Sequence, residues 1–155
     1  QEIVWVKPCV ILTYSFYSWR HEPCLLMWIK GNKPDYKPKN KSIGSVWTVG
    51  FLRSGDPATP EYHTDVWELD WEGKKRNSGL DHPTVKPTEV FAIPMRVHTT
   101  PGDICYEPFS GSGSQIIAGE RLNRRVFAME LEPVFCDVAV RRWEEFTGKK
   151  AILNG

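Results

Sequence analysis

The sequence predicts an α/β protein built around a parallel sheet, and three features of its second half lead to that prediction. Residues 103–131 run from a short apolar segment through a glycine-rich turn and a helical pattern to a second apolar segment. A second helical pattern follows at 133–146, with apolar residues at i, i+3 and i+4 spacing. Strand, helix, strand, helix at this spacing is typical of βαβ units, whose strands are parallel.

Each element of this second half has its own signal. We expect strands at 103–106 and 125–131, helices at 115–122 and 133–146, and one more strand at 149–153. A further helix is expected within 82–97, where Pro87 suits the first turn and Pro94 should kink or end the helix.

The first half is less regular. Two short apolar runs at 3–6 and 9–12 are split by Lys7 and Pro8, and the apolar run 22–31 predicts a strand buried on both faces. Residues 32–80 are rich in proline, basic and aromatic residues without strong periodicity. Such a length without regular elements suggests an insertion with its own role.

The composition narrows the class of protein. The 155 residues are 41% hydrophobic and 25% charged, which is ordinary for a soluble globular domain. Because the net charge is only +1, binding of a nucleic acid would depend on local basic patches and not on the overall charge. No apolar run approaches the roughly 20 residues of a membrane span, and no leader-like segment opens the chain. The four cysteines are widely spaced and are expected to be reduced core residues of a cytoplasmic protein: Cys9, Cys24, Cys105 and Cys136.

The glycine-rich turn "EPFSGSGSQ" (107–115) predicts a ligand site, because such loops lie at the carboxyl end of parallel strands. Gly111 and Gly113 would let the backbone approach a ligand closely. A phosphate-binding P-loop is excluded, since no lysine follows Gly113, and Ile116 stands where a dinucleotide fingerprint needs its third glycine. S-Adenosylmethionine suits the loop better, with Glu130, 19 positions after Gly111, as the acid that holds its ribose. A plain βα turn remains open from these residues alone.

The segments "HPTVKP" (82–87) and "PGDICYEPFSGSGSQIIAGERLNRRVFAMELEP" (101–133) resemble, in their order and motifs, the C-terminal half of the amino DNA methyltransferases of the permuted beta type. The resemblance is dense over residues 81–147. It implies a partial Rossmann-like sheet of the kind found in S-adenosylmethionine-dependent methyltransferases. It also implies an activity, the methylation of the exocyclic amine of adenine (N6) or cytosine (N4) in DNA. It also implies three parts: late strands of the catalytic domain at 1–31, a target-recognition insert at 32–80, and the cofactor-binding part at 81–155.

The resemblance assigns roles to residues of this chain. Glu130 would bind the ribose, Phe109 to Gly113 would form the cofactor loop, and Lys86 and Thr84 would hold the methionine end. The full set of expected cofactor residues is His82, Pro83, Thr84, Lys86, Glu107, Phe109, Ser110, Gly111, Ser112, Gly113, Ser114 and Glu130. The chain departs from the family at Glu107, where aspartate is usual, and at Ser114 and Gln115, which replace a commoner pair of threonines.

The catalytic residues stay unknown at this point. The family uses a [D/N/S]-P-P-[Y/F/W] turn that accepts hydrogen bonds from the target amine and stacks on the flipped base. The sequence contains no Pro-Pro dipeptide, and in the permuted order this turn precedes Gln1. We therefore expect an upstream segment or another chain to supply it. The alternative is a non-catalytic remnant or DNA-binding module that keeps the fold.

DNA is the expected partner, and no metal site is predicted. Two basic clusters in the insert suit phosphate contacts, although a solvated basic loop explains them equally well: Lys37, Lys39 and Lys41, and Lys74, Lys75 and Arg76.

Overall fold

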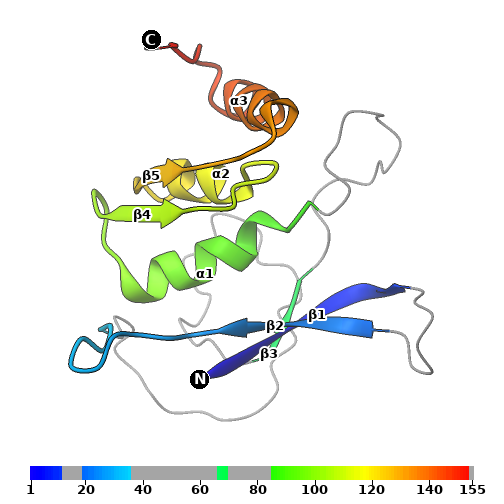
Figure 1. Ribbon diagram of the computed structural model, residues 1–155, viewed down its shortest axis with the longest axis vertical. Coiled ribbons are helices and arrows are strands. Elements are labelled where there is room, and N and C mark those ends of the chain that lie inside the picture. The colour runs from blue at the N-terminus through cyan, green and yellow to red at the C-terminus, as the bar shows by residue number, and fades with distance from the viewer. Residues whose placement is uncertain (12–18, 36–65, 70–84, 154–155) are drawn as a thin grey trace, which may run out of the picture. The chain divides into compact units, whose positions relative to one another are not determined.

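The chain divides into two compact units, Gln1–Trp71 and Glu72–Gly155 (Figure 1). The computed structural model describes residues 1–11, 19–35, 66–69 and 85–153. None of the helices in these ranges is long and apolar enough to cross a membrane.

The first unit contains a three-stranded sheet in the order β2-β1-β3. Strand β2 is antiparallel to β1 and β3 is parallel to it. The bounds are Glu2–Ile11 for β1, Trp19–Leu25 for β2 and Val66–Glu68 for β3. Trp5 in β1 is only 1% exposed and is the largest fully buried side chain of the described residues, so it forms the centre of this unit's packing.

Strand β1 runs without interruption from the apolar run at 3–6 through Lys7 and Pro8 to Ile11 in the second run. Pro8 has no backbone N–H to donate to a ladder. The pairing with β2 absorbs this loss through a register shift between Val6 and Ile11. Buried Lys7 also holds the two strands together, because its Nζ lies 2.7 Å from a carboxylate oxygen of Glu22 on β2.

The prediction of a strand buried on both faces at 22–31 is wrong. Strand β2 ends at Leu25, which pairs with Glu2 at the start of β1. Leu26 still exchanges backbone hydrogen bonds with Gln1, its N–H donating to the Gln1 carbonyl at 2.9 Å and its carbonyl accepting from the Gln1 amine at 3.0 Å. Met27 and Ile29 beyond it are 76% and 78% exposed. A continuous apolar run therefore did not identify a buried strand here.

The second unit follows the predicted order of elements, and its α/β fold is confirmed (Figure 1). Strands β4 and β5 are parallel, and helix α2 connects them. The register places Ile104 opposite Arg125 and Glu107 opposite Ala128. The bounds are Thr88–His98 for α1, Ile104–Glu107 for β4, Ser114–Arg121 for α2, Arg125–Ala128 for β5 and Pro133–Thr147 for α3.

Helix α1 continues through Pro94 to His98, so the expectation that it could end at this proline is wrong. Pro94 deprives one carbonyl in the preceding turn of its helical donor. Met95 and Val97 beyond the proline are nonetheless buried, and Met95 packs with Ala92 and with Ala118 of α2. This packing on both sides of the proline outweighs the missing hydrogen bond.

Residues 149–153 do not form the predicted strand. Lys149 binds Glu120 at 2.9 Å, and Lys150 binds Glu144 at 3.0 Å. The N–H of Ala151 also donates to Glu144. The ammonium groups and the backbone N–H of this segment are thus bound by side-chain carboxylates and not by the backbone of a neighbouring strand.

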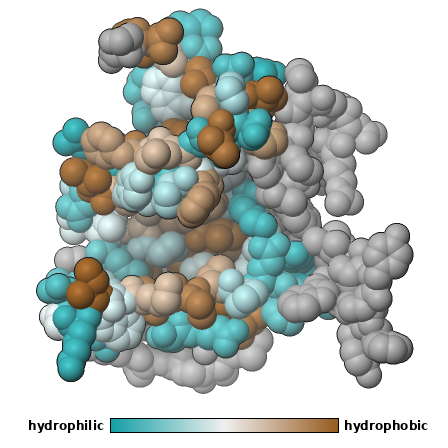
Figure 2. All heavy atoms as spheres, in the orientation of Figure 1, coloured by the Kyte–Doolittle hydropathy of each residue, from teal (hydrophilic) through white to brown (hydrophobic). Residues whose placement is uncertain are grey.

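The outer surface mixes residue types. Figure 2 shows hydrophobic residues interspersed among hydrophilic ones on the face that it draws. Phe146, which lies on the predicted apolar face of α3, is 48% exposed, whereas Val138 and Ala139 of the same face are buried. Cys136 is also exposed, which corrects its predicted place in the core; Cys24 and Cys105 are partly buried. The side chain of Cys9 lies outside the described residues.

Candidate functional site

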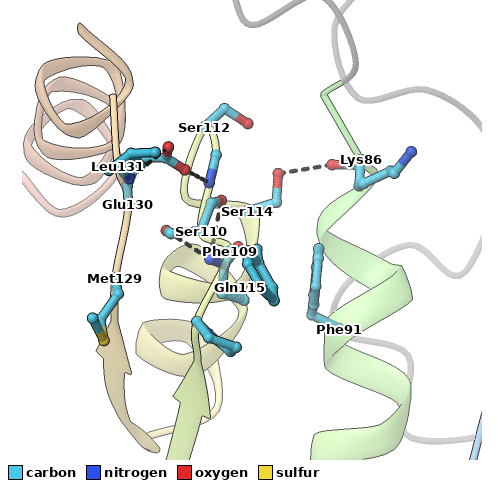
Figure 3. Close-up of a pocket in the computed structure, with 12 residues that line it drawn as sticks. Lys86, Phe91, Phe109, Ser110, Ser112, Ser114, Gln115, Met129, Glu130 and Leu131 are labelled. Atoms are coloured by element: carbon cyan, nitrogen blue, oxygen red, sulfur yellow. Dashed lines mark hydrogen bonds between the residues drawn. The ribbon is translucent and has the colours of Figure 1, made fainter. Parts of the chain in front are cut away.

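The glycine-rich loop lies where the carboxyl ends of two parallel strands meet. It begins after Glu107, the last residue of β4, and ends where α2 begins at Ser114. This is the edge at which open α/β sheets bind ligands. A cavity of about 500 Å³ opens beside the loop (Figure 3), and its size falls within the range of roughly 300–1,000 Å³ that is usual for small-molecule sites. Its lining comprises Lys86, Phe91, Pro108, Phe109, Ser110, Gly111, Ser112, Ser114, Gln115, Met129, Glu130 and Leu131.

Glu130 joins the loop to the end of β5. One carboxylate oxygen accepts a hydrogen bond from the N–H of Gly111 at 2.6 Å (Figure 3). The other oxygen accepts from the N–H groups of Leu131 at 2.9 Å and Glu132 at 3.0 Å. The predicted proximity of Glu130 to the loop is therefore present, and the carboxylate is already engaged with backbone donors.

Ser110 and Gln115 form a second connection within the loop. The amide nitrogen of Gln115 donates to the Ser110 hydroxyl at 2.7 Å and to the Ser110 carbonyl at 3.1 Å. Gln115 is 2% exposed, and the Ser110 N–H donates to the carbonyl of Met129 at 2.8 Å. The buried glutamine thus stabilises the conformation of the loop and also lines the cavity. The sequence showed Gln115 only as a departure from the family's threonine and did not indicate this role.

Lys86 contributes its backbone to the site. Its carbonyl accepts a hydrogen bond from the Ser114 hydroxyl at 2.7 Å, which links the segment before α1 to the start of α2. Figure 3 shows the ammonium of Lys86 directed away from the glycine loop. An ionic contact from Lys86 to a ligand in the cavity therefore requires its side chain to turn.

The two glycines of the loop serve different purposes. Both have positive φ, +54° for Gly111 and +77° for Gly113, a region that favours glycine. Gly111 lines the cavity and donates to Glu130, whereas Gly113 is not part of the lining. A Cβ built at Gly113 would lie 2.7 Å from the Cβ of Ala139 on α3. Gly113 therefore allows close approach of a helix, where the sequence had suggested close approach of a ligand.

Aromatic and aliphatic side chains form the apolar part of the cavity. Phe109 extends from the loop and is 86% exposed, and Phe91 faces the same space from α1 (Figure 3). Met129 and Leu131 flank Glu130 on the opposite side. The sequence carries little signal for these residues: Phe91 is one of several apolar residues in the helix expected within 82–97, and of residues 129–131 only Glu130 belongs to the predicted site.

Glu107 lies at the base of the loop and does not line the cavity. Its carboxylate accepts a hydrogen bond from the N–H of Phe109 at 2.9 Å, and its carbonyl accepts one from the N–H of Met129 at 2.8 Å. In this structure Glu107 orders the turn.

Several predicted residues lie outside the described part of the chain. These are His82, Pro83, Thr84, Lys37, Lys39, Lys41, Lys74, Lys75 and Arg76. Within the ranges that the structure describes, no group of three or more His, Cys, Asp or Glu residues is arranged to hold a metal ion.

Comparison with known proteins identifies related sequences and folds. The model of the DNA methylase family, which covers N6- and N4-methyltransferases, matches residues 1–141. The chain is 35% identical over 147 residues to the Type II methyltransferase M2.MboI of Moraxella bovis and 29% identical to the Type II methyltransferase M.BglII of Bacillus subtilis. The crystal structure of an M1.HpyAVI-SAM complex superposes with a TM-score of 0.58 at 23% identity, covering 92% of this chain and 61% of that one.

The match extends over most of this chain but only part of each relative. It covers 94% of the chain and 50% of M2.MboI, and 88% of the chain and 40% of M.BglII. The chain thus spans about half the length of the curated relatives that it matches.

Proposed function

This chain belongs to the DNA methylase family, and from that premise we propose that it carries the S-adenosylmethionine-binding part of a DNA amino-methyltransferase. The complete enzyme would transfer the sulfonium methyl group to the exocyclic amine of adenine (N6) or cytosine (N4), within a Type II restriction-modification system like those of its relatives. We place this activity in the cytoplasm, where such an enzyme meets both DNA and cofactor.

The geometry of Glu130 and the glycine loop is the observation that supports this proposal most. The carboxylate lies at the end of β5 and contacts the N–H of Gly111, so an acid and a turn without side-chain bulk border the same cavity. An adenosine bound there would place its ribose hydroxyls near the carboxylate, which accepts hydrogen bonds from vicinal hydroxyls. The neutral loop, with no lysine after Gly113, suits a cofactor that has no phosphate.

We divide the residues of the site between the two ends of the cofactor. Phe91, Phe109 and Leu131 provide apolar surface for the adenine. We assign the methionine end to the segment His82 to Lys86, with Thr84 and Lys86 as its polar contacts. Because the Lys86 ammonium points away from the loop, this assignment requires a change of side-chain rotamer on binding.

Binding also requires Glu130 to share its carboxylate. Each carboxylate oxygen has two lone-pair directions, and backbone N–H groups already use at least three of the four. A ribose that engages both oxygens must therefore displace at least one of these backbone bonds. The cofactor site of the free protein is formed in outline and rearranges locally when it is filled.

Methyl transfer itself needs groups that this chain does not contain. The target amine is a weak nucleophile, because its lone pair is delocalised into the base. The family's Pro-Pro turn, which orients that amine, is absent from the 155 residues. We propose that an upstream segment or a second chain supplies it. We further propose that residues 32–80 recognise the target sequence, and that the two basic clusters in this insert contact DNA phosphates.

Calorimetric titration with S-adenosylmethionine tests the proposed site. Wild-type protein is expected to bind, and Glu130→Ala to lose binding by about tenfold or more, since hydrogen bonds to a charged group contribute about 1.5–3 kcal/mol. Glu132→Ala is the matched control, because that side chain is exposed and makes no capping hydrogen bond to α3.

Two outcomes would contradict this assignment. Folded wild-type protein that binds no S-adenosylmethionine would favour the non-catalytic remnant. Binding of NAD in competition with S-adenosylmethionine would instead favour an oxidoreductase.

A further inference from the structure

Helix α3 packs against the glycine loop, and none of its residues lines the cavity. Ala139 is in van der Waals contact range of Gly113, where an added Cβ would come within 2.7 Å. Arg142 follows three residues later and therefore projects from the same face of the helix. Neither Ala139 nor Arg142 lines the cavity.

Arg142 hydrogen-bonds to the loop through a single guanidinium nitrogen. Nη1 donates to the carbonyl of Ser112 at 2.6 Å and to its hydroxyl at 2.9 Å. The same nitrogen lies 3.2 Å from the hydroxyl of Ser114. Both serines are buried, at 5% and 2% exposed, whereas Arg142 is half-buried, so the bonds themselves are partly buried.

The chemistry of arginine sets the direction of these bonds. A guanidinium only donates, so in its contact with Arg142 the Ser114 hydroxyl is the acceptor; Nη1 has two hydrogens for three acceptors, so one N–H is shared between two of them. The hydroxyl proton of Ser114 is then directed to the carbonyl of Lys86, 2.7 Å away. A chain of donors thus runs from Arg142 through Ser114 to Lys86 and connects α3, the loop and the segment before α1.

Two parts of the cavity lining depend on this series of hydrogen bonds. Ser112 and Ser114 belong to the loop, and Lys86 belongs to the segment that we assign to the methionine end of the cofactor. We propose that Arg142 is a positioning residue for S-adenosylmethionine: it touches no part of the ligand and holds the loop and the Lys86 backbone at the separation that the cofactor needs. This inference rests on the proposed function, and nothing in the sequence motif marks Arg142.

The test compares substitutions at two adjacent arginines in the full chain. Arg142→Gln removes the cation, and Arg142→Lys keeps the charge without the planar fork. Arg141→Gln is the matched control, because Arg141 is exposed on α3. For each protein, titration gives the dissociation constant for S-adenosylmethionine, hydrogen–deuterium exchange reports on residues 107–115, and thermal unfolding is followed without ligand.

The expected result separates positioning from folding. Arg142→Gln should accelerate exchange in the loop and weaken binding by about tenfold, because a loop released from α3 must be ordered again when the cofactor binds. Its melting temperature should stay within a few degrees of wild type. Arg142→Lys should be intermediate and Arg141→Gln should match wild type in all three measurements.

Ser114→Ala provides a second variant should Arg142→Gln fold poorly. It interrupts the chain at its middle, so it should also weaken binding, and the effects of Arg142→Lys and Ser114→Ala should be less than additive in the double variant. Wild-type affinity in folded Arg142→Gln, or full additivity in the double variant, would overturn the inference while leaving the cofactor site intact. Failure of wild-type protein to bind S-adenosylmethionine would overturn both proposals.

Discussion

The carboxylate of Glu130 and the backbone N–H of Gly111 are 2.6 Å apart, although 19 residues separate them in the chain. This bond closes the space between the end of β5 and the glycine loop after β4. The conformation of the loop in the free protein therefore depends on a charged acceptor at position 130, independently of any ligand.

Glu130→Gln tests that dependence. One oxygen of the amide can still accept, but the NH₂ group must face one of the two sets of backbone N–H donors. We expect a loss of about 1–2 kcal/mol in the free energy of unfolding, at the lower end of the range for charge-assisted bonds because the contact is only partly buried. Amide exchange at Gly111 should accelerate, measured by NMR. Glu132→Gln should change neither quantity, and equal effects of both variants would contradict this account.

Gly113→Ala should destabilise the second unit through its contact with α3. The added Cβ would meet the Ala139 Cβ at 2.7 Å, and φ is +77°. Left-handed backbone costs about 1–2 kcal/mol for an alanine, and overpacking adds about 1–3 kcal/mol. Urea denaturation of Gly113→Ala and Gly102→Ala separates these costs, because Gly102 has φ +90° with nothing within 4 Å of its added Cβ.

Ala139→Gly in the Gly113→Ala background should recover part of the lost stability, since it removes the closest atom. If Gly102→Ala and Gly113→Ala cost the same free energy of unfolding, the contact with α3 is not the reason for a glycine at position 113.

Gly119→Ala should also destabilise the protein, although alanine is the better helix former by about 1 kcal/mol. The new Cβ would lie 2.2 Å from Cγ2 of Val126, where α2 packs on β5. We expect a net loss of about 1–2 kcal/mol from overpacking. Val126→Ala in the same protein should reduce the loss caused by Gly119→Ala, measured as a double-mutant cycle by urea denaturation. A stabilised Gly119→Ala protein would show that the contact relaxes without cost.

The segment after α3 should detach as pH falls. Hydrogen bonds from Lys149 and then Trp143 lower the pKa of Glu120, and bonds from the Ala151 N–H and then Lys150 lower the pKa of Glu144. A depressed carboxyl pKa stabilises the fold above the unfolded value of about 4.3, and this contribution disappears as pH falls through the folded pKa.

Amide protection at Ala151 measures this detachment. Protection should hold from pH 7 to about 5 and decline below the unfolded carboxyl pKa of about 4.3. In Glu144→Gln the decline should be largely absent. Protection that persists in wild-type protein at pH 3 would contradict the proposed attachment.

The two cysteines of the second unit should react at different rates. Burial raises the pKa of the Cys105 thiol, with Arg124 opposing the shift and Asp103 adding to it. Cys136 is exposed on α3. Because the thiolate is the nucleophile, alkylation at pH 8 should modify Cys136 well before Cys105, as followed by peptide mass spectrometry. Faster labelling of Cys105 would show that the β4 region opens readily.

Short-range sequence patterns were sufficient to predict most local elements of the second unit. The glycine-rich turn, the helical periodicity on either side and the spacing from Gly111 to Glu130 all express properties of short stretches, such as backbone freedom at glycine and apolar spacing along a helix. These properties hold wherever the segment lies. They were sufficient to predict parallel strands, the loop between them and the acid beside it.

The contact partner of each residue could not be predicted in this way, because it depends on how distant segments pack. Gly113 faces Ala139, Arg142 reaches Ser112 across 30 positions, and the carboxylates of Glu120 and Glu144 engage the residues predicted as a strand. Helix α1 passes Pro94 because buried neighbours on both sides outweigh one missing hydrogen bond. Each of these outcomes depends on the packing of segments distant in sequence, and no local pattern encodes the identity of the surface that a residue meets.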